Sequence, residues 1–247
     1  MPRIRLASWL IAALGALAAQ PGYTAGADER PTRHEIWDIK LGAKIDALPD
    51  DFIDYACGTN GGPPGLALSG WKDFRRCRAE PSGLREVYLR FDDEEEYIGR
   101  AIDDDQYTRK IGTRVAGHPV ILSVLFDAGG ILRGIRFVTD PRAAPAERRM
   151  AHLLRLAAIN RYGPQGWTCV DQPAAAGETA VGGVFIKQRC RKTTTERDLT
   201  VEAHFLRKPG QSETDPATGE YRAGQYESWT RFELMDPGFP TAVTRRD

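Results

Sequence analysis

The four cysteines are the feature that most constrains how this 247-residue chain can fold. They are Cys57, Cys77, Cys169 and Cys190, and they form two pairs with spacings of 20 and 21 residues, one pair in each half of the chain. None belongs to a C-x-x-C motif, so zinc ribbons, thioredoxin-type sites and c-type haem attachment lack their spacing. Four cysteines allow three disulfide connectivities. The spacing favours Cys57–Cys77 and Cys169–Cys190, each expected to contribute about 3 kcal/mol by closing its loop.

The amino-terminal segment predicts export. Two arginines precede the uncharged apolar run Leu6–Ala19, and Ala25–Ala27 supplies a small-x-small cleavage site, with Ala16–Ala18 as an earlier alternative. This layout is typical of a secretory signal peptide over residues 1–27. The run is shorter than the roughly 20 residues that a membrane-spanning helix needs, so cleavage is favoured over an uncleaved anchor. We therefore expect a periplasmic or secreted protein without membrane insertion after cleavage, in which an even number of cysteines favours disulfides.

The charge balance excludes two classes of partner. The chain has 34 basic and 34 acidic residues, and residues 1–27 contain two arginines and no acid. The remainder therefore carries 32 basic and 34 acidic residues, a net charge near −2. Nucleic acids and anionic membrane surfaces attract a concentrated positive field, so neither is expected as the main partner.

In the first half, the pattern predicts one helix and a strand hairpin. Pro49 and two aspartates start the expected helix and Gly58 ends it. The two hairpin strands, 120–127 and 131–139, are rich in β-branched and aromatic residues and flank a glycine turn. A further strand is expected over residues 35–41.

The second half predicts one helix followed by short strands. Proline at the start, Glu147 in the first turn and a terminal Gly163-Pro164 indicate a helix over residues 145–162. The expected strands are 167–171, 184–191, 199–207 and 226–235, with a polar loop over 208–225. Loops of that length are usually functional or disordered.

The two halves share an order of elements, which predicts a duplicated architecture. Each half has a helix, a cysteine near its end, a second cysteine after it and then a hairpin. We therefore predict an α+β fold of two tandem helix-plus-antiparallel-sheet units, each with one disulfide, over residues 28–142 and 143–247.

The stretch IKLGAKIDALP (Ile39–Pro49) adds a resemblance. It is similar to the segment before the first helix in proteins of the β-lactamase-inhibitor-protein fold and in small outer-membrane assembly lipoproteins. The tandem α+β pattern with one disulfide per unit resembles the same group. The resemblance implies a non-catalytic binding role and assigns no binding residue.

Local motifs for catalysis or metal binding are missing from the sequence. No two of the four histidines stand three or four residues apart, as helical metal ligands do. The acidic run Asp92–Asp105 lacks the ligand spacing of an EF-hand and is expected to be a solvated helix. We predict no metal and no cofactor. The alternative to a binding module is an exported hydrolase with a dispersed carboxylate or histidine site that uses His118, His204 or Asp127.

The stretch YACGTNGGPPG (Tyr55–Gly65) could suggest a phosphate-binding loop or a reactive thiol. A phosphate loop leads from a strand into a helix and has free backbone N–H groups, whereas here the glycines are expected to follow a helix and two prolines remove donors. The prediction is a flexible loop closed by the first disulfide.

Aromatic side chains are the best candidates for binding. Trp71 and Trp167 lie near cysteines, where a large aromatic residue either fills the local core or anchors a partner. Tyr221 and Tyr226 lie in and next to the long polar loop. We predict contact with a protein or a cell-envelope component through these residues.

Overall fold

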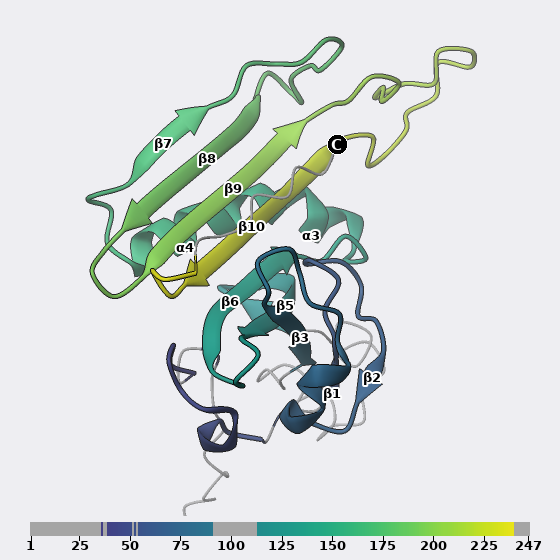
Figure 1. Cartoon of the computed structure of the whole chain (residues 1–247). Coiled ribbons are helices and arrows are strands. Elements are labelled where there is room, and N and C mark those ends of the chain that lie inside the picture. The colour runs from purple at the N-terminus through teal and green to yellow at the C-terminus, as the bar shows by residue number, and fades with distance from the viewer. Residues whose placement is uncertain (1–35, 37–38, 51, 53, 91–112, 240–247) are drawn as a thin grey trace, which may run out of the picture. The chain divides into compact units, whose positions relative to one another are not determined.

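The structure is a computed structural model that describes residues 36, 39–50, 52, 54–90 and 113–239. The ten strands of this part form an antiparallel sheet in the order β2-β1-β3-β5-β6-β10-β9-β8-β7, and β4 pairs with β5 (Figure 1). The strands are β1 (Asp54–Cys57), β2 (Ala67–Leu68), β3 (Arg85–Arg90), β4 (Arg114–Val115), β5 (His118–Phe126), β6 (Leu132–Thr139), β7 (Thr168–Asp171), β8 (Ile186–Thr193), β9 (Asp198–Leu206) and β10 (Glu227–Met235).

The predicted fold class is wrong, because the two halves share one sheet. Strand β10 from the end of the chain pairs with β6 from the first half, with Phe232 opposite Phe137. The two half-sheets therefore join side by side instead of forming separate helix-plus-sheet units. The expected boundary between residues 142 and 143 falls in the connection after β6 and stays a prediction.

Local pattern identified the second-half elements and the hairpin correctly. Strands β5 and β6 form the predicted antiparallel hairpin, with a register shift at Leu125/Phe126. Strands β7, β8, β9 and β10 occupy the predicted regions. The acidic run 92–105 lies outside the described residues.

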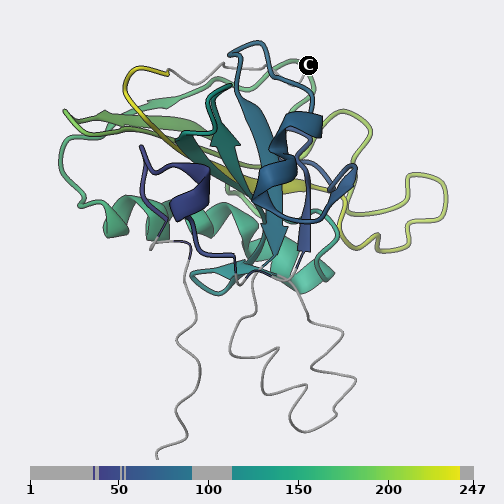
Figure 2. The ribbon, with the colours of Figure 1, turned by 60° about the horizontal axis from the view of Figure 1, so that its bottom comes forward.

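One long helical segment packs on the sheet. It consists of α3 (Pro145–Met150), the 3-10 turn η4 (Ala151–Leu153) and α4 (Leu154–Arg161), as predicted. Its start is fixed by proline at the first helical position and by the Ala144 N–H, which donates to Glu147 Oε2 at 3.3 Å. Figure 2 shows the segment along one side of the sheet. We call that side the helix face and the other side the opposite face.

The helix face holds the main core. Phe232 lies there between Phe137, at a ring-centroid distance of 4.5 Å, and Tyr162, at 5.5 Å. At the other end of the same core, Trp71 and Phe74 from the 3-10 helix η3 (Trp71–Arg76) pack against Phe126. A single apolar cluster therefore extends from the helical segment to the first-half strands.

The helix expected from Pro49 to Gly58 is also wrong, since its second half is strand β1. Tyr55 and Cys57 face the core, and their strand pairs with β3 on one side and β2 on the other. Sheet pairing and burial outweigh the local helix signals here, as tertiary context often does. In the resembling stretch before it, the described helical structure is the 3-10 turn η2 (Ile45–Ala47), and the described residues between this turn and β1 form no helix.

Residues 39–41, at the end of the strand expected over 35–41, lie in no strand.

The described helices are all too short or too polar to cross a lipid bilayer.

We expect Phe232→Ala to lower the free energy of unfolding by about 3–5 kcal/mol, because it removes a buried ring between two aromatic neighbours. Urea denaturation followed by circular dichroism measures this loss. Leu156→Ala on the outer side of α4 is the matched control, since Leu156 is 45% exposed, and its effect should stay below about 1 kcal/mol. Equal losses in both variants would contradict the assigned core.

Candidate functional site

Both disulfides are present in the predicted pairing. Cys57–Cys77 links β1 to the residue after η3, with a Cα–Cα distance of 5.2 Å. Cys169–Cys190 joins directly opposite residues of β7 and β8, with a Cα–Cα distance of 4.0 Å. One bridge therefore fixes the start of the glycine loop, and the other fixes the edge strand of the sheet.

The glycine loop, residues 58–65, lies on the opposite face and binds a carboxylate of the protein itself. The N–H groups of Asn60 and Gly61 donate to the carboxylate of Glu86, the second at 3.2 Å. The Gly58 N–H donates to the backbone carbonyl of Glu86 at 2.9 Å. Gly61 has a φ of +75°, and a Cβ there would lie 2.3 Å from Val138 Cγ2, so only glycine fits.

Glu86 belongs to a buried charge cluster that also contains Glu80, Arg136, Arg231 and Glu233. Arg136 is 4% exposed. Its Nη1 lies 2.6 Å from Glu80 Oε1 and 3.0 Å from Glu86 Oε2, and its Nε donates to Glu233 Oε1 at 2.7 Å. Arg231 Nη2 donates to the same oxygen of Glu233 at 2.5 Å.

A further arginine contact ties the charge cluster to the glycine loop. Arg231 Nη1 donates to the carbonyl of Asn60 at 2.9 Å, and its Nη2 donates to the Asn60 side-chain oxygen at 2.6 Å. The cluster therefore joins β3, β6, β10 and the loop through charge-assisted hydrogen bonds.

The surroundings of the cluster set the direction of each resolved pKa shift. Burial would raise the pKa of Glu233, but attraction by Arg231 and Arg136 outweighs it and holds the pKa below its ordinary value. Burial opposes the charge of Arg136, but Glu86, Glu80 and Glu233 together keep its pKa above the ordinary value. The pKa of Arg231 is lowered, chiefly by burial. Each carboxylate of the cluster has a cationic or backbone partner, so the arrangement has the character of a structural network.

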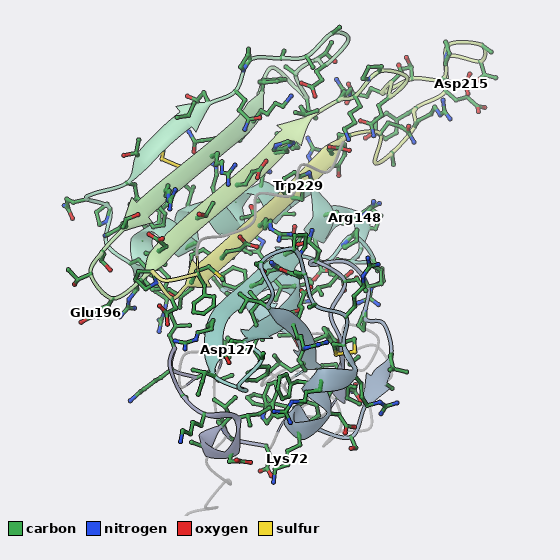
Figure 3. The ribbon with its side chains drawn as sticks, in the orientation of Figure 1. Lys72, Asp127, Arg148, Glu196, Asp215 and Trp229 are labelled. Carbon is green, nitrogen blue, oxygen red and sulfur yellow. A yellow bond between two sulfur atoms is a disulfide. The ribbon has the colours of Figure 1, made fainter. Side chains whose placement is uncertain are left out.

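A second group of side chains lies on the same face near the junction of β9 and β10. The rings of His204 and Trp229 stack with a centroid distance of 4.1 Å (Figure 3 labels Trp229). His204 Nε2 is 3.4 Å from Glu202 Oε1. Hydrogen bonding to His204 holds the pKa of Glu202 below its ordinary value, although burial opposes this. This aromatic pair is half-buried and lies beside charged side chains.

The connection between β9 and β10, residues 207–226, projects beyond the strand ends as an arm, with Asp215 near its outer end (Figure 3). Thr214 and Tyr221 form a β-bridge across it. Arg207 pairs with Glu213 at 3.0 Å near its base. Tyr221 is 68% exposed, the largest value among the large hydrophobic side chains of the described residues. The arm therefore presents an aromatic ring on an ordered support.

The predicted aromatic residues lie in different environments. Trp71 is 4% exposed and donates through Nε1 to the Pro49 carbonyl at 2.7 Å, so its ring belongs to the core. Trp167 is half-buried and donates to the Gly163 carbonyl at 2.9 Å. Tyr226 packs against Phe205 and donates to the Pro145 carbonyl at 3.3 Å. Tyr226 thus anchors the base of the arm that exposes Tyr221.

The structure separates two of the residues considered for a hydrolytic site. His118 begins β5 and Asp127 follows its end, so about 30 Å of extended strand lies between them. Asp127 accepts hydrogen bonds from the N–H groups of Gly129 and Ile131 within the hairpin turn. His204 instead contacts Trp229. Among the described residues, no group of three or more histidine, cysteine, aspartate or glutamate side chains is arranged to hold a metal.

A cavity of about 410 Å³ lies on the helix face beside the end of α4. Its lining combines apolar side chains such as Ile135 and Leu234 with the charged Lys40, Glu196 and Arg197. We assign it no ligand.

Comparisons with protein-family models, with curated proteins and with solved structures found no match.

The charge cluster gives a testable pH dependence. We expect Arg136→Met to lower the free energy of unfolding at pH 7 by about 3–5 kcal/mol, because it removes the cation shared by three carboxylates of the buried cluster and leaves Glu233 with Arg231 alone. In the parent protein, the pKa of Glu233 in the folded state lies below its ordinary value of 4.5. Ionised Glu233 therefore stabilises the fold above about pH 4.5, and this stability is lost as the pH falls through the folded-state pKa. In the variant the pKa of Glu233 rises, so protonation stabilises the fold.

The difference between the parent protein and Arg136→Met should therefore shrink as the pH falls from 7 to 4, as measured by urea midpoints. Arg142→Met is the control, because its side chain is 55% exposed in its pair with Asp140, and it should change stability by less than about 1 kcal/mol at both pH values. A constant difference for Arg136→Met across this range would refute the role given to the cluster.

Proposed function

We propose that this protein is an exported, non-catalytic binding module that contacts another protein of the periplasm or cell envelope. Two disulfides in a chain of this size are consistent with an exported protein. The signal-like segment over residues 1–27 supports export to the periplasm or beyond.

The observation that carries the binding role is the exposure of Tyr221 on the arm. Tyrosine and tryptophan dominate the energetic centres of protein interfaces, since a large flat ring buries much area at low entropy cost. Tyr221 is 68% exposed, while Tyr226 and the ion pair of Arg207 with Glu213 hold the arm in place. An ordered arm loses less conformational freedom when a partner binds.

The stacked pair His204–Trp229 lies on the strands that carry the arm and extends the proposed surface onto the opposite face. The charges around it are paired: Lys187 with Glu178 at 2.8 Å and Lys208 with Glu227 at 2.6 Å. Paired charges around an aromatic centre suit a protein partner with a mixed polar and apolar surface, and they favour it over a highly charged polymer.

Export is tested by fusing residues 1–27 to a reporter enzyme that is active only after transport across the inner membrane. We expect reporter activity and a mature amino terminus at Asp28. Replacing Leu10 and Leu14 by arginine breaks the apolar run and should abolish the activity. An active reporter with the broken run, or none with the intact one, would refute export by this segment.

The binding surface is tested by placing a photo-cross-linking aromatic amino acid at position 221 and, as a control, at position 156. Both side chains are exposed, but Leu156 lies on α4, on the helix face. We expect a discrete adduct with an exported protein only from position 221. Binding of that purified protein should weaken at least tenfold in Tyr221→Ala, about 1.4 kcal/mol or more. Unchanged affinity, or equal adducts from both positions, would overturn the assignment.

A further inference from the structure

Strand β7 forms one edge of the sheet (Figure 1). Among the described strands it pairs only with β8, and each of its four residues is exposed. An edge strand presents backbone groups that can pair with another strand. The other edge is β2, which has only two residues.

The register shows which backbone groups of β7 point outward. The Gln172 N–H donates to the Lys187 carbonyl at 2.7 Å, so this opposed pair is a hydrogen-bonded one. Hydrogen-bonded and non-hydrogen-bonded pairs alternate in antiparallel sheets. The pairs of Cys169 with Cys190 and of Asp171 with Gln188 are therefore non-hydrogen-bonded, in agreement with the short Cα–Cα distance of 4.0 Å at the disulfide. The N–H and carbonyl groups of Cys169 and Asp171 point away from β8.

An exposed apolar side chain lies between these two residues. Val170 is 59% exposed, and alternation places it on the opposite face. An antiparallel partner strand that bonds Cys169 and Asp171 would set its own central residue beside Val170, at the close Cα spacing of a non-hydrogen-bonded pair.

The same segment of a second copy offers both the backbone groups that would pair with Cys169 and Asp171 and an apolar side chain that would lie beside Val170. With a two-fold axis at Val170, Cys169 of each copy faces Asp171 of the other, and this forms about four backbone hydrogen bonds. The two Val170 side chains then pack against each other. Such self-complementarity is what a two-fold interface demands.

The surrounding charges permit this contact. Three basic residues of β8 lie on the opposite face: Lys187 pairs with Glu178 at 2.8 Å, and Arg191 pairs with Asp198 at 3.3 Å. The third, Arg189, is the cross-strand neighbour of Val170 and lies directly opposite Glu202 of β9. The disulfide also holds β7 in place before any partner arrives.

We propose that this protein self-associates by antiparallel pairing of β7 with β7 of a second copy, which makes one sheet continuous across the dimer.

The dimer is expected to be weak. Four residues on each side bury far less than the roughly 800 Å² per partner of a standard stable interface. Its dissociation constant should therefore lie in the micromolar to millimolar range, and the dimer should form reversibly with concentration.

Analytical ultracentrifugation of the purified protein from 10 µM to about 1 mM, combined with amide exchange by NMR, tests the proposal. We expect a monomer–dimer equilibrium in which the amides of Cys169 and Asp171 become protected as concentration rises. The amides of Thr168 and Val170, which already bond to β8, should be protected throughout.

Asp171→Pro removes an outward N–H and keeps the backbone bonds to β8, while it also removes the carboxylate that accepts from Gln188 Nε2 at 2.8 Å. It should weaken the dimer at least tenfold. Asp171→Ala, which loses the same side chain but keeps the N–H, is its control and should dimerise like the parent. Val170→Lys places like charges at the two-fold axis and should also weaken the dimer at least tenfold. Circular dichroism confirms that each variant is folded.

Three results would overturn the proposal. They are a monomer up to 1 mM, a dimer that leaves the Cys169 and Asp171 amides unprotected, or folded Asp171→Pro and Val170→Lys variants that dimerise like the parent. The second result would assign the dimer to another surface.

Discussion

The guanidinium group of Arg136 lies at the centre of the sheet and contacts carboxylates from three positions along the chain, Glu80, Glu86 and Glu233. A buried ion pair contributes little net stability compared with apolar packing, but a buried charge without a partner is strongly destabilising. The cluster therefore mainly specifies the register in which β10 pairs with β6. A one-residue slip of β10 against β6 would turn Glu233 to the helix face and leave Arg136 without it. The union of the two half-sheets depends on this match.

Sequence reasoning succeeded where local pattern and final structure agree. The helix at 145–161, the β5–β6 hairpin and both disulfides follow from caps, alternation and spacing. It failed at β1, where helix signals compete with sheet pairing, and at the β6–β10 junction, whose residues lie about 100 positions apart. A signal for the charge cluster was present: Arg136 lies between the apolar Ile135 and Phe137, and Glu233 lies between Phe232 and Leu234. Their partners could not be identified, because cross-strand neighbours depend on the sheet order.

The glycine loop binds an anion of the protein itself with the backbone groups that could bind an external one. Backbone N–H groups in a tight loop bind anions, and the sequence analysis considered phosphate and rejected it. In the structure the anion is the carboxylate of Glu86, held by Asn60 and Gly61. A Cβ at Gly58 would lie 2.1 Å from the Glu86 side chain. The glycine content of the loop is therefore explained by close contact with the protein's own charge cluster.

Each disulfide fixes a segment to the main core through buried cysteines, Cys57 and Cys77 in one bridge and Cys190 in the other. Cys57–Cys77 fixes the start of the glycine loop, and Cys169–Cys190 fixes an edge strand whose residues are all exposed. The arm has no such crosslink and depends instead on the Tyr226 anchor and its ion pairs. Ion pairs at an exposed site are weak, so the packing and hydrogen bond of Tyr226 contribute most to the order of the arm. The two proposed surfaces therefore offer different chemistry: the arm offers an aromatic side chain to another protein, whereas β7 offers backbone groups to an identical strand.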